Sequence, residues 1–242
     1  MIVSWFSAGV SSAIATKLAI EKYGDIKVFY NTIDDQHPDS ERFLSDVERW
    51  LNINIERIDS PYKSVENVVR QFRFINSPRG AKCSQILKHR PRREWEELQR
   101  DKNPNVELHY IWGLDKSEQH RADRFSSFMP GIKHEFPLID NGIEKEVAHE
   151  LLRDAGIARP KMYELGFPNN NCIGCVKGGR GYWNAIREHF PEVFKKRAEL
   201  EREIKRSCIN GVFLDELEPD TGRMLPVTIP DCGMFCFKEA AE

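Results

Sequence analysis

The sequence predicts an α/β protein with a doubly wound, mostly parallel sheet, followed by a Cys-bearing extension of helices and loops. In the first half of the 242-residue chain, short apolar runs alternate with helical patterns, an order that favours parallel strands joined by right-handed crossovers. From about Pro160 the strand signals fade, and segments rich in Gly, Asn and Cys replace them. We therefore expect an α/β domain over residues 1–159 and an extension over residues 160–242 that packs on it.

The individual elements are predicted from the hydrophobic pattern, taken in chain order. Compact apolar runs predict strands at residues 2–6, 27–33, 54–58 and 108–112. Helical patterns occur in the Ala-rich segment after residue 12 and at residues 43–51, 143–155, 181–190 and 191–206. Gly156 and Pro191 support two of these limits, because Gly favours the position after a helix and Pro is tolerated in its first turn.

Composition excludes several classes of protein. The chain has 36 basic and 38 acidic residues and a formal net charge of -2, which argues against a protein that coats nucleic acid. Its longest apolar runs fall short of the roughly 20 residues that span a bilayer, so we expect no membrane segment. The first residues have no basic stretch and no long apolar stretch, so we expect no signal peptide and a cytoplasmic location. In such a reducing compartment, six cysteines are more often metal-binding or catalytic than paired in disulfides.

A loop of small residues joins the first expected strand to the first expected helix. It consists of Ser7, Ala8, Gly9, Val10, Ser11 and Ser12. Small residues let backbone N–H groups approach an anion, the helix N-terminus adds partial positive charge, and the hydroxyls add donors. Ligands of open α/β sheets also bind at the carboxyl ends of the strands. A tight turn capped by Ser would have a similar composition, and the Gly-Lys-Ser/Thr ending of a Walker A loop is missing.

This loop resembles the PP-loop of the adenine nucleotide alpha-hydrolase superfamily, whose usual form is Ser-Gly-Gly-x-Asp-Ser. Ser7, Gly9 and Ser12 match that pattern, while Ala8 replaces the first Gly and Ser11 replaces the Asp. The Asp is typical of members that bind ATP with Mg²⁺ and release pyrophosphate.

Four later segments resemble the phosphoadenosine phosphosulfate (PAPS) reductase branch of that superfamily, in the same order along the chain. They are residues 31–39, the segment Trp112-Gly113-Leu114-Asp115 with Glu118 and Arg121, the segment Phe136-Pro137-Leu138, and the segment Cys172-Ile173-Gly174-Cys175. The resemblance runs from about residue 2 to residue 236. It implies a nucleotide-binding domain over residues 1–159, in which an adenine nucleotide is held by the loop together with Ile33, Asp34, Asp35, Gly113 and Arg121. The pair Asp34-Asp35 could hold Mg²⁺ or ribose hydroxyls, although acids at a strand end are often simple caps.

Five of the six cysteines fall in three clusters. Cys172 and Cys175 have the spacing of metal ligands or of a redox pair. A zinc site could combine them with Cys232 and Cys236, but the gap between the two pairs is much wider than the roughly 12–20 residues of usual zinc modules. A [4Fe-4S] cluster tolerates distant thiolates and is therefore favoured over zinc. Cys208 stands apart and is expected to be a small buried apolar residue.

The family resemblance implies roles for these cysteines. In cluster-bearing sulfonucleotide reductases, a Cys-Cys pair and a later Cys-x-x-Cys bind a [4Fe-4S] cluster. That pattern assigns Cys83, Cys172 and Cys175 as ligands, with Lys82 at the place of the missing Cys. The fourth ligand could be Cys236 or Cys232, or the fourth iron could be open. The tail around Cys232 also resembles the Glu-Cys-Gly-x-His tail of those reductases, with Phe235 in place of the His, so Cys232 could instead be the catalytic nucleophile.

Basic residues lie beside two of the cysteine clusters. Lys88 and Arg90 belong to a dense basic run after Cys83, and Lys177 and Arg180 follow Cys175. Such runs are usually solvated, but here they could bind phosphate or sulfate groups, with Arg suited to bidentate contact. They could also contact a nucleic-acid backbone.

Three functions are compatible with these residues. The first is a PAPS reductase-like oxidoreductase or sulfur transferase, in which Cys232 attacks the sulfonate sulfur of PAPS or APS, AMP or its 3′-phosphate leaves, and a thioredoxin-like thiol releases sulfite. The second is an ATP-dependent enzyme that adenylates nucleic acid for thiolation, with the cluster supplying sulfur and the basic run docking the polymer. The third is a nucleotide-binding or zinc-stabilised module without catalysis, suggested by Ala8, Ser11 and Phe235.

Overall fold

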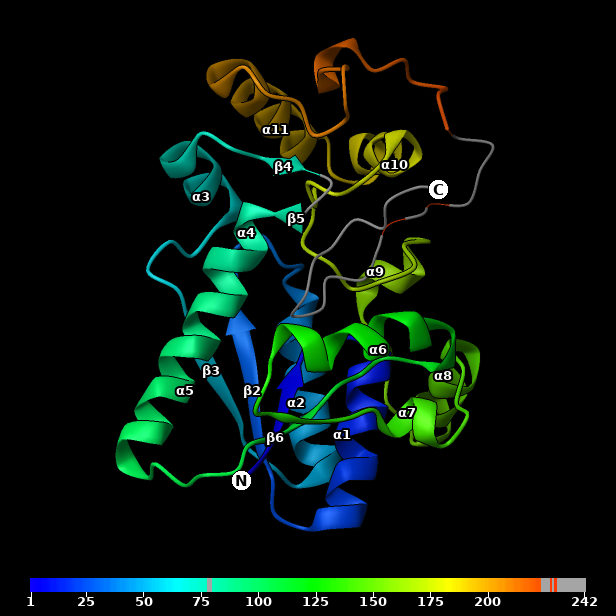
Figure 1. Cartoon of the computed structure of the whole chain (residues 1–242). Coiled ribbons are helices and arrows are strands. Elements are labelled where there is room, and N and C mark those ends of the chain that lie inside the picture. The colour runs from blue at the N-terminus through cyan, green and yellow to red at the C-terminus, as the bar shows by residue number, and fades with distance from the viewer. Residues whose placement is uncertain (78–79, 223–226, 228, 230–242) are drawn as a thin grey trace. The chain divides into compact units, whose positions relative to one another are not determined.

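The computed structural model describes residues 1–77, 80–222, 227 and 229, and its chain divides into two compact units (Figure 1). The first unit consists of Met1–Asn31, Pro38–Ile58 and Glu94–Lys161. The second consists of Thr32–His37, Asp59–Arg93 and Met162–Glu242. The last crossing between the units, after Lys161, lies next to the boundary predicted at residue 160. Two earlier segments, residues 32–37 and 59–93, also belong to the second unit, although the sequence analysis placed them in the first domain.

A five-stranded sheet forms the centre of the first unit. Its strands are β1 (Ile2–Phe6), β2 (Lys27–Thr32), β3 (Ile55–Asp59), β6 (His109–Ile111) and β7 (Lys133–Glu135). Their order is β3-β2-β1-β6-β7, and the β1–β2, β1–β6 and β6–β7 pairs are parallel. The four predicted strands are confirmed. The fifth, β7, is a three-residue edge strand of polar residues, Lys-His-Glu, and therefore carries no apolar run that could predict it.

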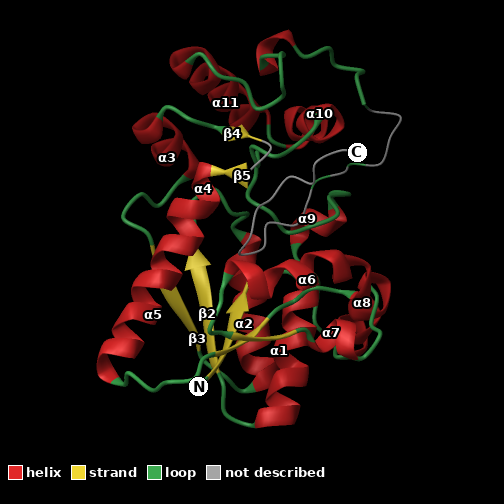
Figure 2. Ribbon diagram, viewed as in Figure 1, coloured by secondary structure: helices red, strands yellow, loops and turns green. Residues whose placement is uncertain are grey.

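Helices cover both faces of this sheet (Figure 2). Trp5 of β1 packs against Trp95 of α5 (Arg90–Lys102), with ring centroids 5.7 Å apart. The next residue, Phe6, packs against Phe43 of α2 (Asp39–Leu51) at 6.3 Å. Successive side chains of a strand point to opposite faces, so α5 and α2 lie on opposite sides of the sheet. The doubly wound α/β prediction is therefore confirmed.

The five predicted helices are also confirmed, and several short ones appear beside them. The predicted helices are α1 (Val10–Tyr23), α2, α8 (Lys145–Asp154), α10 (Arg180–His189) and α11 (Pro191–Ile204). The others are α3 (Val65–Phe72), α4 (Lys82–Ser84), α5, α6 (Gln119–Phe128), α7 (Pro137–Asp140) and α9 (Lys161–Glu164). A π-helical turn, Gln85–His89, joins α4 to α5.

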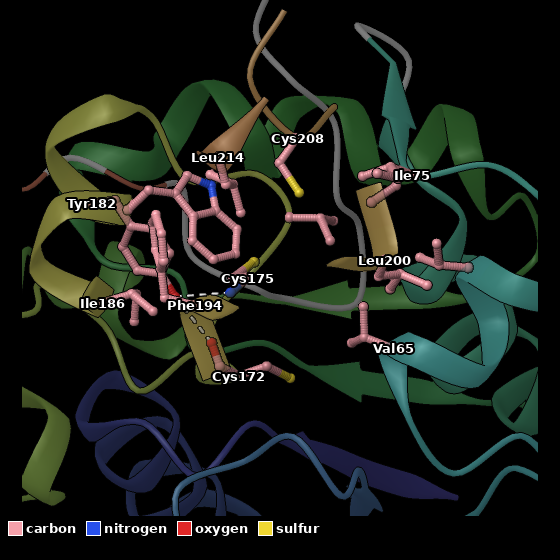
Figure 3. Close-up of a cluster of buried hydrophobic side chains, with 14 of the residues drawn as sticks. Val65, Ile75, Cys172, Cys175, Tyr182, Ile186, Phe194, Leu200, Cys208 and Leu214 are labelled. Carbon is pink, nitrogen blue, oxygen red and sulfur yellow. Dashed lines mark hydrogen bonds between the residues drawn. The ribbon is translucent and has the colours of Figure 1, made fainter. Parts of the chain in front are cut away.

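The second unit has a hydrophobic core built mainly by helices. Side chains from α3, α10 and α11 form one buried cluster, which also contains Cys172, Cys175 and Cys208 (Figure 3). A short antiparallel pair, β4 (Asn76–Ser77) with β5 (Gly80–Ala81), belongs to the same unit. The largest fully buried side chains of this core include Trp183 and Tyr182 of α10.

Across the described ranges, no helix is both long enough and apolar enough to cross a membrane.

Candidate functional site

The loop between β1 and α1 is closed on itself by one hydroxyl group. Ser12 Oγ accepts hydrogen bonds from the backbone N (3.2 Å) and the Oγ (3.1 Å) of Ser7, and it donates to the carbonyl of Gly9 at 2.9 Å. Gly9 is the residue that precedes α1, and the first turn of α1 contains no acidic residue. The positive end of the helix is therefore not neutralised from within the helix, as suits an anion-binding loop.

Ala8 adopts an unusual backbone conformation in this loop. Its φ is 56°, in the left-handed region that favours glycine, and its side chain is buried. This is the position at which the superfamily pattern has its first Gly. The loop therefore keeps the conformation that the pattern requires, although the residue is Ala.

Gly113 follows β6 and lies against the start of α1. A Cβ atom on Gly113 would be 2.5 Å from Cα and 2.7 Å from the backbone N of Ser12. Any side chain here would collide with the backbone of the loop. The structure thus brings Gly113 together with the loop residues, as the sequence analysis predicted.

Arg121 is placed by a capped turn just after Gly113. Asp115 caps the turn Lys116–Glu118 through a hydrogen bond from the backbone N of Ser117 at 3.0 Å. Glu118 then forms an ion pair with Arg121 within the same unit. An anion that binds Arg121 would have to compete with this carboxylate.

The acidic pair Asp34-Asp35 belongs to the second unit. Asp34 is exposed, but both carboxylate oxygens of Asp35 bind the protein itself: Oδ2 accepts from the backbone N of Val65 at 2.6 Å, and Oδ1 pairs with Nη2 of Arg197 at 3.2 Å. Burial raises the pKa of Asp35, and Arg197 opposes that rise. Asp35 thereby connects α3 to α11. Ile33, predicted to contact the nucleotide, is buried in the core of this unit.

The Cys-x-x-Cys loop is held by Tyr182 of α10. The Tyr182 hydroxyl accepts a hydrogen bond from the backbone N of Cys175 at 2.8 Å and donates to the carbonyl of Cys172 at 3.2 Å. Gly178 makes room for this ring, since a Cβ there would be 1.9 Å from Tyr182. The spacing of the two cysteines is thus fixed by a buried phenol.

Cys208 is fixed beside the same loop by two polar side chains. Asn76 donates from Nδ2 to the carbonyl of Cys208 at 3.2 Å and also to the carbonyl of Val176, so it joins the segment after Cys175 to the segment of Cys208. The buried carboxylate of Glu201 accepts hydrogen bonds from the backbone N of Cys208 and, at 2.7 Å, of Leu214. In the view of Figure 3, the sulfur atoms of Cys175 and Cys208 point toward each other.

Cys83 completes a set of four thiols in one core. It lies in α4 and packs against the buried cluster that contains the other three cysteines. The guanidinium of Arg197 is within electrostatic reach of Cys83, Cys175 and Cys208. The three predicted ligands Cys83, Cys172 and Cys175 are thus brought into one core despite their separation in the sequence. The other predicted cysteines, Cys232 and Cys236, lie outside the described residues.

Arg197 is itself buried, with 5% of its surface exposed. Its Nη2 pairs with Asp35, whereas its Nε and Nη1 are buried and have no hydrogen-bond partner among the described residues. Buried donors without partners are rare, because each costs about 1–3 kcal/mol. The core of the second unit therefore contains a cation with two donors that the described protein does not satisfy.

The donor set fits a cluster better than a single ion. No group of three or more His, Cys, Asp or Glu side chains within the described ranges is arranged to hold a metal ion. A zinc ion needs ligands that converge about 2.3 Å from one point, whereas a [4Fe-4S] cluster takes one thiolate on each of four irons. Four thiols around a buried cation are the chemistry that such a cluster requires. Burial raises the pKa of Cys208, so this thiol would release its proton on binding iron.

The four basic residues predicted to bind phosphate or sulfate divide into two kinds. Lys88, in the π-helical turn, and Lys177, after Cys175, are buried. Arg90 and Arg180 are exposed. All four belong to the second unit, so the basic run is only partly a solvated face.

The sequence analysis missed Arg197, Tyr182, Asn76 and Glu201. A signal for two of them exists in the helical pattern of α11, where Arg197 and Glu201 share a face with Phe194 and Ala198. Charged residues on the apolar face of a helix indicate a buried polar site. Tyr182 and Asn76 carry no comparable signal, because their roles arise from tertiary contacts.

Comparisons with known proteins were made for the whole chain. The family model of the phosphoadenosine phosphosulfate reductase domain matches residues 1–180. Among solved structures, the chain is similar to a phosphate complex of phosphoadenylyl-sulfate (PAPS) reductase from Candida auris, with 12% sequence identity and a TM-score of 0.47, over 70% of this chain and 80% of that chain. No curated protein matches the sequence.

Proposed function

The chain belongs to the phosphoadenosine phosphosulfate reductase family, and from this premise we propose that it binds PAPS, APS or ATP at the loop Ser7–Ser12 and performs sulfonucleotide reduction or sulfur transfer. One observation carries the proposal: the loop is closed by Ser12 at the carboxyl end of β1, against a helix whose first turn has no acidic residue. Backbone N–H groups in such a loop can bind the anionic groups of a nucleotide. Gly113 keeps the space beside the loop free of side chains.

The proposed reductive reaction has two steps. A thiolate, which we assign to Cys232, attacks the sulfonate sulfur; a new S–S bond forms, the bond from sulfur to the phosphate oxygen breaks, and AMP or its 3′-phosphate leaves with the electron pair. A thioredoxin-like dithiol then reduces the Cys–S–SO₃⁻ adduct, which releases sulfite and returns the Cys to a thiol while the dithiol is oxidised to a disulfide. Positive groups near the sulfonate would stabilise its negative charge, and Lys88, Arg90, Lys177 and Arg180 are the residues we propose for this role.

We also propose a [4Fe-4S] cluster, with Cys83, Cys172 and Cys175 among its ligands. The support is the presence of these cysteines in one buried core together with Arg197. When bound, the cluster would supply a redox-active, sulfide-containing centre. The chain's own contribution is to exclude water from that core and to orient Cys172 and Cys175 through Tyr182.

The loop assignment is tested by nucleotide binding to purified protein. Calorimetric titration with PAPS, APS and ATP should give binding by at least one nucleotide, and Ser12→Ala should weaken it about tenfold by removing the hydroxyl that closes the loop. Ser45→Ala, on the exposed face of α2, is the control and should bind as the wild type does. Equal affinity for Ser12→Ala and the wild type, or no binding of any of the three nucleotides, would contradict the proposal.

The reaction is then identified by its product. Sulfite from PAPS or APS in the presence of thioredoxin selects the reductase. Pyrophosphate from ATP would select the adenylating enzyme of nucleic-acid thiolation instead. Retained nucleotide binding without either product would indicate a non-catalytic module. The replacement of the PP-loop Asp by Ser11 favours the first outcome.

A further inference from the structure

Cys208 is the one described cysteine for which the proposed function has no role. It comes from the segment after α11, far in sequence from the other three, yet it shares their buried cluster. Asn76 connects its backbone to the segment after Cys175, and Glu201 fixes its amide. Two polar side chains are thus used to hold a residue that, as a simple apolar filler, would need neither of them.

Arg197 supplies an independent observation at the same place. It interacts electrostatically with Cys208, Cys83 and Cys175, and its Nε and Nη1 donors are buried without partners among the described residues. The hydroxyl of Ser84, next to Cys83, and the indole N–H of Trp183 are further buried donors in this unit for which the described chain offers no acceptor. Unsatisfied donors that gather near thiols indicate that an acceptor-rich, negatively charged group belongs there.

We infer that Cys208 is the fourth ligand of the [4Fe-4S] cluster and that Arg197 is the buried positive charge that balances it. This inference rests on the cluster of the proposed function. A cube of four irons and four sulfides held by four thiolates is negatively charged, and burying that charge is costly unless a cation is near. Arg197 provides this cation, and its Nε and Nη1 groups provide hydrogen bonds to sulfur. Asp35 holds the guanidinium from the other side through Nη2.

The ligand assignment is tested on the full-length protein, purified without oxygen, by iron and sulfide analysis and by electron paramagnetic resonance. The wild type should contain about four irons and four sulfides per chain. Cys208→Ser should lose the [4Fe-4S] signal and at least a quarter of the iron, whereas Cys232→Ser and Cys236→Ser should keep both. Cys208→Ser with full iron and an unchanged signal would overturn the inference, and loss of the signal in Cys236→Ser instead would assign the fourth ligand to the tail.

The role of Arg197 is tested by the midpoint potential of the cluster. Nearby positive charge and hydrogen bonds to sulfur favour the reduced, more negative cluster, so Arg197→Met should lower the potential, and Arg197→Lys should restore most of the difference. The double variant Asp35→Asn/Arg197→Met avoids leaving a buried carboxylate alone if the single variant does not fold. Asp35→Asn alone keeps the guanidinium and should not lower the potential. Unchanged potentials in both Arg197→Met variants would overturn the role.

These outcomes separate the inference from the proposed function. A wild-type protein without iron and sulfide would remove the cluster itself, whichever residue is the fourth ligand. An iron-loaded wild type with an indifferent Cys208→Ser variant would leave the cluster in place and remove only the inference. Nucleotide binding at the loop is measured apart from either result.

Discussion

Ala8 shows how a single residue can retain a loop conformation at a cost. Its φ of 56° is unfavourable for a residue with a Cβ, by about 1–2 kcal/mol, and the chain nevertheless keeps the loop closed. Ala8→Gly should therefore leave the free energy of unfolding unchanged or raise it by up to about 1 kcal/mol, after the larger entropy of unfolded Gly is subtracted. Chemical denaturation measures this difference.

The matched control for that substitution is Ala13→Gly, inside α1. Ala13 is a buried helical residue, so glycine there should destabilise by about 1 kcal/mol or more. Equal losses for the two variants would show that Ala8 is not strained in the folded protein.

Gly113 is the residue at which the loop tolerates least change. Gly113→Ala places a Cβ 2.5 Å from the backbone of Ser12, and backbone cannot rotate away as a side chain can. We expect a loss of about 1–3 kcal/mol in the free energy of unfolding together with weaker nucleotide binding. Gly179→Ala is the control, because a Cβ there meets open space, and its change should stay within about 1 kcal/mol. A Gly113→Ala protein with wild-type stability and affinity would contradict the predicted close packing at Ser12.

At the scale of elements, the edge strand β7 is attached to the end of α1 by a buried carboxylate. Glu135 accepts hydrogen bonds from Lys22 (3.0 Å) and from Tyr23. Burial alone would raise the pKa of Glu135, but these hydrogen bonds outweigh it and lower the pKa below its ordinary value of 4.5. Because the folded pKa is the lower one, the stabilisation is present above about pH 4.5 and is lost as the pH falls through the folded pKa.

Glu135→Gln should therefore lower the free energy of unfolding at pH 7 by about 1–3 kcal/mol. The difference from the wild type should shrink as the pH falls below about 4.5, where the wild-type carboxylate also becomes protonated. Urea denaturation at several pH values measures both effects. Glu97→Gln, at an exposed position of α5, should show neither effect. A Glu135→Gln deficit that stays constant down to pH 3.5 would show that the charge is not what stabilises β7.

The elements that the sequence predicts are those with a strong hydrophobic period. β1 and β2 are apolar runs, and the first and last predicted helices were located to within a few residues. β7 escaped prediction because its residues are polar, and α5 because a π-helical turn and Pro91 interrupt the usual period before it. Periodicity reports burial on one face, so elements that are short, at an edge or interrupted leave little of it.

For the whole molecule, the sequence predicts which residues matter better than it predicts how they group. The motif order correctly indicated the loop, Gly113 and the family. The pattern around residue 160 indicated one boundary, whereas the second unit also takes residues 32–37 and 59–93. That grouping brings Cys83 and Asp35 into the core of Cys172, Cys175 and Cys208. It depends on contacts between distant segments, which no local pattern encodes.

The division into two units predicts that removal of the cluster acts on one of them. The sheet of the first unit has its own core, in which Trp5, Phe29 and Trp95 pack together without any cysteine. The second unit joins segments around residues 83, 172, 175 and 208, which a cluster would tie together, so its folding free energy should depend on metal. Chelation of iron should therefore reduce the hydrogen-exchange protection of α10 and α11 at least tenfold and leave β1 and β6 nearly unchanged. Exchange measured peptide by peptide tests this, and an equal loss of protection in β1 would show that the two units unfold as one.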